Sequence, residues 1–241
     1  FGMHGTGIAT AADSLAAIKK YVFDEKYISA ADMLKAVDEN FENSPELLDK
    51  LRNEAPKMGC DDDYVDNISV ELLDTFADCL EGKKNCEGGV WRAGTGSAMF
   101  YLWHAREIGA SPDGRRSGEP FGTNFSAFAK VSGPVSVVKS FTKQHFVRAI
   151  NGGPLTLEFH NSVFRGEGSL EKVASIVKYF IDRGGHQLQL NAVNLETMKD
   201  AQKHPEDHKR LVVRIWGWSA YFVELDKEYQ DHVIARQEYT V

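Results

Sequence analysis

Apolar residues recur at helical spacing through the first third of the chain. Leu15, Ile18 and Val22 share one face of a predicted helix, and Asp13 or Ser14 precedes them as a helix cap. The same spacing and the usual helix-start residues predict three further helices, over residues 29–41, 44–55 and 67–80. The first third of the chain is therefore predicted to be mainly helical.

After residue 87 the sequence becomes rich in aromatic residues and glycine, and short apolar runs then alternate with helical patterns. Predicted strands cover residues 133–141, 152–164, 186–194 and 210–226, and predicted helices cover residues 170–182, 195–203 and 227–237. Alternation of strands and helices favours an α/β architecture with parallel strands. We therefore expect residues 1–87 and 88–241 to differ in structure.

Composition narrows the class of protein. The chain has 241 residues, of which 42% are hydrophobic, so it can bury a substantial core. Its net charge of −7 argues against nucleic-acid binding, which needs a basic face. No apolar run approaches the ~20 residues that span a bilayer and no signal peptide is evident, so we expect a cytoplasmic protein without a membrane partner.

Several familiar site patterns are weak in this chain. His204 and His208 stand four residues apart, but Pro205 separates them, so a metal pair on one helix is not expected. The glycine-rich segments GMHGTG and RAGTGSA lack the spacing of phosphate-binding loops. The three cysteines have no CxxC spacing and are expected to be reduced thiols. We therefore predict no metal site.

The segment RIWGWSAYF, residues 214–222, is unusual because Gly217 lies between two tryptophans within an apolar run. Glycine destabilises a strand interior, since it orders more backbone and contributes no side chain. From local pattern alone, a turn, a bulge or a close approach of two backbones explains such a glycine. A chemical role needs further support.

Four segments, in order, resemble the carboxyl-terminal portion of glycyl radical enzymes. They are SPDGRRSGEP, GPVSVVKSFTK, GGHQLQLNAVN and RLVVRIWGWSAYFVELDKEYQDHVIAR. The signature of that family near its terminus, Arg-Val-x-Gly-Tyr, is matched by residues 214–218, so the resemblance identifies Gly217 as the radical site. It places Arg214, Trp216, Trp218, Ser219 and Tyr221 around the radical. In the first segment, Arg115, Arg116 and Glu119 are expected to fix a turn through charge-assisted hydrogen bonds.

The resemblance also implies a fold. It predicts the C-terminal part of the ten-stranded β/α barrel of glycyl radical enzymes, with a helical N-terminal third. Residues 1–87 would form the mainly helical part, and residues 88–241 the later barrel strands and the glycyl radical domain, with the glycine loop at about 211–225. The family's barrel interior corresponds to four residues that are candidates for substrate contact: Thr95, Ser97, Phe159 and His160.

The family's chemistry accounts for the choice of glycine. Loss of a Cα hydrogen leaves a radical shared between the amide nitrogen and the carbonyl, and this sharing needs a planar centre that a Cβ would crowd. Burial of Gly217 among Trp216, Trp218, Tyr221 and Phe222 would exclude water and oxygen. A separate activating enzyme, an iron–sulfur protein that uses S-adenosylmethionine, installs the radical, so no cofactor bound by the chain itself is expected.

In the family the radical passes from glycine to a catalytic cysteine well upstream. None of Cys60, Cys79 and Cys86 lies in the corresponding loop, so the chain resembles a radical-storing fragment that is inactive alone. Its partners would be the activating enzyme, a small-molecule substrate and other copies of the protein, in an anaerobic, oxygen-sensitive system.

The tryptophans beside Gly217 are similar to those of arylacetate decarboxylases. The resemblance therefore favours decarboxylation of 4-hydroxyphenylacetate to p-cresol, and a small iron–sulfur subunit accompanies such enzymes. The alternatives within the family are decarboxylation of indoleacetate or phenylacetate, dehydration, and formate acetyltransfer. Two further alternatives are a stand-alone spare part that docks onto a damaged enzyme and a structural domain in which Gly217 is only a bulge.

Overall fold

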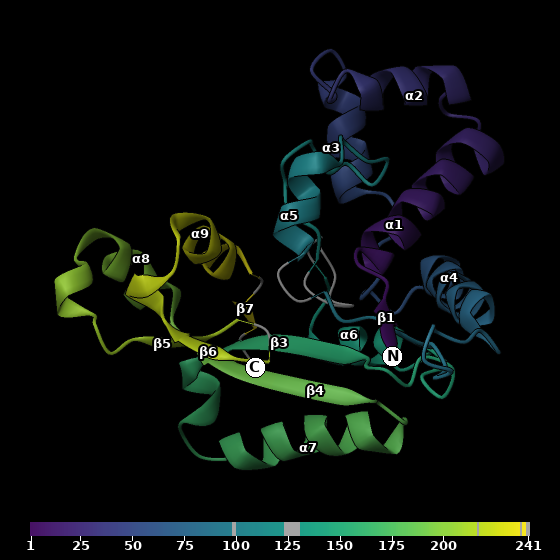
Figure 1. The fold of residues 1–241 in the computed structure, drawn as a ribbon. Helices are drawn as coiled ribbons and strands as arrows, with labels where there is room; N and C mark the ends of the chain where they lie inside the picture. The colour runs from purple at the N-terminus through teal and green to yellow at the C-terminus, as the bar shows by residue number, and fades with distance from the viewer. Residues whose placement is uncertain (98–99, 123–130, 216, 237, 240–241) are drawn as a thin grey trace. The chain divides into compact units, whose positions relative to one another are not determined.

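The computed structural model describes residues 1–97, 100–122, 131–215, 217–236 and 238–239 (Figure 1). The chain divides into two compact units, each formed by two stretches of sequence. The first contains Phe1–Leu155 and Phe180–Gln187, and the second contains Thr156–Tyr179 and Leu188–Val241. The expected division at residue 87 stays a prediction. The described part of the chain contains no helix that is both long and apolar enough to cross a membrane.

The first unit is mainly helical, as predicted. A short parallel pair joins strand β1 (Gly2–His4) to strand β2 (Arg92–Gly94). The helices are α1 (Ile8–Ile18), which continues as a π-helical turn (Lys19–Asp24), α2 (Ala30–Asp38), α3 (Pro45–Asn53), α4 (Asp63–Leu80), α5 (Phe100–Glu107) and α6 (Pro134–Phe141). The helices expected at 29–41, 44–55 and 67–80 are confirmed by α2, α3 and α4.

Helix α1 begins at Ile8, so the predicted start at Asp13 or Ser14 is wrong. Gly7 precedes the helix with a φ of 79°, and a run of alanines then lets α1 pack closely against α4. Asp13 and Ser14 are buried inside the helix and form tertiary hydrogen bonds. Asp13 accepts from the Met58 N–H at 2.7 Å, and Ser14 donates to Asp113 at 3.3 Å.

The strand predicted over residues 133–141 is also wrong, because this segment forms helix α6. Pro134 occupies the first helical turn, where its missing N–H costs nothing. Val137, Val138 and Phe141 share the buried face, so packing at helical spacing outweighs the strand preference of the valines. Ser140 fixes the helix by donating to Asp66 at 2.9 Å.

The PDGRR segment forms the turn that its charges predicted. The fully buried Arg115 guanidinium donates to the Ser111 hydroxyl at 3.1 Å and to the carbonyls of residues 108, 109, 116 and 119. Glu119 accepts from the Arg116 N–H at 2.8 Å and from the Arg52 guanidinium. The prediction is confirmed for Arg115 and Glu119, whereas Arg116 takes part through its backbone.

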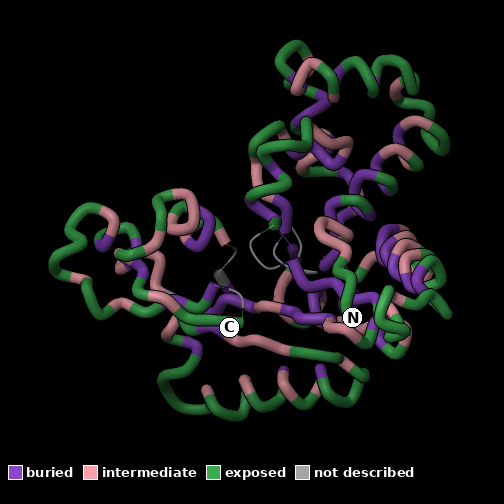
Figure 2. The backbone as a smooth tube through the Cα atoms, viewed as in Figure 1, coloured by how far each residue is buried: buried purple, intermediate pink, exposed green. Residues whose placement is uncertain are grey.

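The second unit alternates strands and helices. Its sheet has the order β4-β3-β7, and β7 (Glu238–Tyr239) pairs in parallel with β3 (Pro154–His160). A 3-10 turn (Asn161–Phe164) and α7 (Ser169–Asp182) connect β3 to β4 (Gln187–Val193). Strand β3 is buried along most of its length (Figure 2). These elements confirm the strands expected at 152–164 and 186–194.

The rest of the second unit surrounds a small apolar core. Helix α8 (Leu195–Lys203), a 3-10 turn (Pro205–Asp207), the hairpin of β5 (Val212–Arg214) and β6 (Ser219–Tyr221), a 3-10 turn (Phe222–Glu224) and α9 (Lys227–Ala235) follow in order. Met198, Val213, Ile215, Phe222 and Val233 form the core between α8, the hairpin and α9. The described part of the chain thus contains a mainly helical unit and a unit that alternates strands and helices.

Replacing Arg115 with Lys should lower the free energy of unfolding by about 3 kcal/mol, because one ammonium cannot satisfy the acceptors that the planar guanidinium reaches. Urea unfolding measures the change. The exposed Arg92 provides the matched control, since Arg92→Lys should change the midpoint little. An Arg115→Lys midpoint equal to that of the control would contradict the structural role of the turn.

Candidate functional site

Gly217 lies at the tip of the hairpin formed by β5 and β6. The strands are antiparallel, with Val213 opposite Ala220 and Arg214 opposite Ser219, and the Ile215 N–H donates to the Trp218 carbonyl at 3.0 Å. The continuous strand predicted over 210–226 is therefore two short strands around a tight turn. The glycine belongs to this turn and not to a strand interior.

The backbone at Gly217 itself favours glycine. Its φ is 66°, in the left-handed region that L-residues with a side chain seldom adopt. A Cβ built on Gly217 would meet none of the described atoms within 4 Å, so space around the residue is open. The geometry thus confirms the interpretation that Gly217 lies in a turn. A radical role of Gly217 is a separate question of chemistry.

The aromatic side chains that the structure describes near the turn do not form the expected enclosure of Gly217. Gly217, Trp218 and Tyr221 are exposed, and the two rings keep 42% and 46% of their surface accessible. Phe222 is fully buried, but it lies in the core beneath the hairpin. The side chains of Val213, Ile215 and Phe222 are buried in the core, whereas the tip of the hairpin is exposed to solvent. Trp216 lies outside the described residues.

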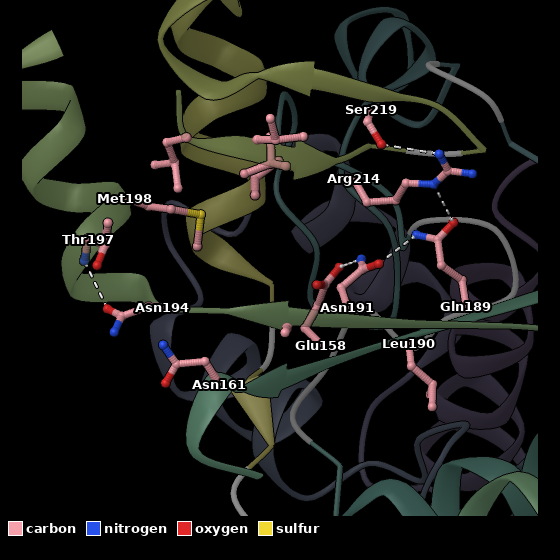
Figure 3. A pocket seen from close by; sticks show the side chains of 15 residues that line it. Glu158, Asn161, Gln189, Leu190, Asn191, Asn194, Thr197, Met198, Arg214 and Ser219 are labelled. Atoms are coloured by element: carbon pink, nitrogen blue, oxygen red, sulfur yellow. Dashed lines mark hydrogen bonds between the residues drawn. The ribbon is translucent and has the colours of Figure 1, made fainter. Parts of the chain in front are cut away.

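Arg214 and Ser219, both predicted surroundings of the radical, face each other across the hairpin. The Arg214 guanidinium donates to the Ser219 hydroxyl at 3.2 Å and to the Gln189 side-chain oxygen at 3.5 Å (Figure 3). Gln189 in turn donates to Asn191 at 3.1 Å, and Asn191 donates to Glu158 at 2.9 Å. A chain of side-chain hydrogen bonds therefore runs from the hairpin to strands β4 and β3.

Arg236 contacts the strand that leads into the glycine turn, and the sequence analysis missed this residue. Its guanidinium donates to the Arg214 and Ile215 carbonyls, each at 3.1 Å, and pairs with Glu158 at 2.8 Å. The side chains of Arg236 and Glu158 are only 9% and 6% exposed. A carboxylate within the otherwise apolar run PLTLEFH was the available signal, because such a charge needs a buried partner.

A pocket of about 480 Å³ lies beside this network. Its polar lining includes Glu158, Asn191, Asn194, Arg214 and Ser219, and Gln189, Asn191 and Arg214 point toward one another at its edge (Figure 3). Asn194 also caps α8 by accepting from the Thr197 N–H at 2.9 Å. One side of the glycine hairpin thus borders a cavity with both polar and apolar walls.

The four candidates for substrate contact fall in both units. Thr95 and Ser97 follow strand β2 in the first unit and are buried, and the Thr95 hydroxyl has no hydrogen-bond partner among the residues that the structure describes. Phe159 and His160 end strand β3. The Phe159 ring is buried against Phe164 and Tyr239. His160 hydrogen-bonds the Ser162 hydroxyl at 2.6 Å and caps the following turn, so substrate contact by these residues stays a prediction.

His204 and His208 share one carboxylate. Asp200 hydrogen-bonds His204 at 3.1 Å and His208 at 2.8 Å, and these contacts lower the pKa of the Asp200 carboxyl. Groups of three or more metal-ligating side chains are absent from the described residues. Cys60, Cys79 and Cys86 are all free thiols, and burial raises the pKa of Cys60.

Models of two protein families match segments that together cover most of the chain. The family described as pyruvate formate lyase-like matches residues 1–103, and the family described as glycine radical matches residues 121–223, including Gly217. The trans-4-hydroxy-L-proline dehydratase of Clostridioides difficile is 35% identical over 99% of this chain. The indoleacetate decarboxylase of Tractidigestivibacter scatoligenes is 30% identical over 97% of it.

Solved structures of similar enzymes have the same fold as this chain. The glycerol-bound form of the B12-independent glycerol dehydratase from Clostridium butyricum superposes with a TM-score of 0.95, at 35% identity, over 100% of this chain and 31% of that chain. The chain spans 30% of the length of the hydroxyproline dehydratase and 29% of the length of the indoleacetate decarboxylase. The expected barrel fold and the resemblance on which it rested are confirmed.

His232 provides a test of the core beneath the hairpin. Burial, reinforced by the Arg236 charge, lowers the pKa of His232 to about 3, whereas an unfolded histidine titrates near 6.5. The unfolded chain therefore gains the proton first, and stability present above pH 6.5 is lost as the pH falls toward 3. Between pH 6.5 and 5 this loss amounts to roughly 2 kcal/mol.

The His232→Gln variant should lose less free energy of unfolding between pH 7 and pH 5 than the unsubstituted chain does, as measured by urea unfolding at each pH. His104→Gln, at an exposed position, should retain the full loss. Equal pH dependence in the His232→Gln variant and the unsubstituted chain would show that His232 is not held neutral.

Proposed function

Because the chain belongs to the glycyl radical enzyme family, we propose that Gly217 is the residue that stores the radical. The observation that carries the proposal is the position of Gly217, at the tip of a tight hairpin within the segment that matches the glycine radical family. Arg214 and Ser219 brace the two strands beside it, and Trp218 and Tyr221 flank the tip.

The chemistry needs a Cα–H bond that breaks so that the hydrogen leaves with one electron. The electron left on Cα is shared between the amide nitrogen and the carbonyl, and the hydrogen atom goes to a carbon radical that the activating enzyme generates by one-electron reduction of S-adenosylmethionine. We propose that this activator is an iron–sulfur protein that uses S-adenosylmethionine. The exposed tip supports this role, since an outside enzyme must reach Gly217.

Protection during turnover is a separate requirement. Trp218 and Tyr221 leave the tip open, so we propose that surfaces other than the described residues of this unit shield the radical from oxygen. The catalytic cysteine is proposed to come from such a surface as well. Homo-oligomers and a small iron–sulfur subunit are further candidate partners.

We propose a carbon–carbon or carbon–oxygen lyase reaction for the whole protein. The tryptophans beside Gly217 support decarboxylation of an arylacetate such as 4-hydroxyphenylacetate or indoleacetate, and one relative bears the name indoleacetate decarboxylase. Dehydration is the second candidate, because the hydroxyproline and glycerol dehydratases are each 35% identical to this chain. Phenylacetate decarboxylation, formate acetyltransfer and a spare-part role are the remaining alternatives.

The radical site is tested by electron paramagnetic resonance. Anaerobic incubation of the full-length protein with its activating enzyme and S-adenosylmethionine should give a doublet, and air should abolish it while splitting the backbone at Gly217. Gly217→Ala and Gly217→Asn should both abolish the doublet. An unchanged spectrum in either variant, or an unsubstituted protein that stays silent with a proven activator, refutes the assignment.

The two variants separate the radical from the turn. Alanine at a φ of 66° costs about 1–2 kcal/mol, whereas asparagine tolerates the left-handed region. Gly217→Asn should therefore unfold in urea within about 0.5 kcal/mol of the unsubstituted protein. A doublet lost with stability retained assigns the defect to chemistry.

The reaction class is tested by product analysis. The activated full-length protein should convert 4-hydroxyphenylacetate to p-cresol or indoleacetate to skatole with release of CO2. Glycerol and trans-4-hydroxy-L-proline are the matched dehydration substrates, for which loss of water is measured. Turnover of a dehydration substrate without CO2 release from either arylacetate would replace the decarboxylase proposal with the dehydratase.

A further inference from the structure

Arg236 lies where helix α9 has ended, and its side chain turns back onto the glycine hairpin. Its backbone is extended, with φ −62° and ψ 143°. The guanidinium reaches two successive carbonyls, those of Arg214 and Ile215, which lead into the turn that contains Gly217. These contacts orient the peptide groups immediately before the turn.

The third partner of Arg236 anchors the hairpin to the sheet. Glu158 in β3 accepts from the same guanidinium at 2.8 Å and from Asn191 in β4 at 2.9 Å. Both charged side chains are at least nine-tenths buried. Removing one member of such a pair leaves an uncompensated buried charge, so the pair holds its geometry strongly.

A second connection secures the outer side of the hairpin. Arg214 spans from Ser219 on β6 to Gln189 on β4, and Gln189 joins Asn191, which also holds Glu158 (Figure 3). The hairpin is thus connected to the sheet through its backbone by Arg236 and through its side chains by Arg214. Both routes meet at Asn191 and Glu158.

We propose that Arg236 is a positioning residue for Gly217, and that it acts by locking the hairpin to strands β3 and β4 through Glu158. The proposal rests on the radical function assigned to Gly217. Hydrogen-atom transfer requires reacting atoms about 3–3.5 Å apart, so a small displacement of the tip slows it. Strands of three residues cannot fix the tip unaided, because short isolated hairpins are marginally stable.

The test compares Arg236→Lys and Glu158→Gln with the control Arg210→Lys in the full-length protein. Arg210 is exposed and lies just before the hairpin. Lysine keeps the charge but not the planar fork that reaches two carbonyls and a carboxylate together. Glu158→Gln keeps the shape and removes the charge, and it serves if Arg236→Lys does not fold.

The first readout is amide hydrogen exchange before activation. The Ile215 and Phe222 amides, which donate within the hairpin, should exchange about tenfold faster or more in Arg236→Lys, with a smaller increase in Glu158→Gln. The amides of α7 should exchange as in the unsubstituted protein, and Arg210→Lys should change neither set. Unchanged hairpin exchange, or an equal increase throughout α7, overturns the proposal.

The second readout is the half-life of the glycyl doublet at a fixed low oxygen concentration. The doublet should form in Arg236→Lys and decay severalfold faster than in Arg210→Lys. A half-life equal to that of the control, despite faster hairpin exchange, would also overturn the proposal. If the unsubstituted protein forms no doublet, the radical function fails, while the exchange measurement still decides whether Arg236 locks the hairpin.

Discussion

The buried contact between Arg236 and Glu158 is the constraint on which the glycine hairpin depends. The hairpin has two strands of three residues and one tight turn, so its own backbone hydrogen bonds are few. One guanidinium supplies hydrogen bonds to two of its carbonyls and links them to a carboxylate in the sheet. The apolar core beneath the hairpin also stabilises it, but apolar packing is not directional. The hydrogen bonds are directional, so they define the orientation of the hairpin.

Two independent requirements meet at Gly217. The backbone needs a residue that accepts a φ of 66°, and the proposed radical needs a Cα without a side chain so that the electron can be shared in a planar centre. Neither requirement excludes the other. A turn is also the place where a glycine is most accessible, whereas a strand interior would cover it with neighbouring chains, so the conformational explanation and the chemical one support the same position.

Local pattern was sufficient where local contacts decide the structure. Helices α2, α3, α7 and α8 have regular apolar spacing and clear start residues, and their expected ranges agree with the structure. Pattern failed at α6, whose valines favour a strand until helical packing buries them, and at α1, where Asp13 and Ser14 bond to distant residues and do not cap. The resemblance singled out Gly217. Asn191 and Arg236, however, lie 33 and 78 positions after Glu158, and only the folded chain brings the three residues together.

Under the proposed function, radical storage at Gly217 is separate from substrate recognition. Arg214, Ser219 and Arg236 contact the hairpin and the sheet, and under the proposed function these contacts would serve any reaction that begins from a stored radical. A dehydratase and a decarboxylase can therefore resemble this chain to a similar degree, at 35% and 30% identity. Trp218 lies at this exposed turn, where a side chain can meet a surface that covers the tip. Under the proposed function, substrate choice would depend on side chains outside this hydrogen-bond network.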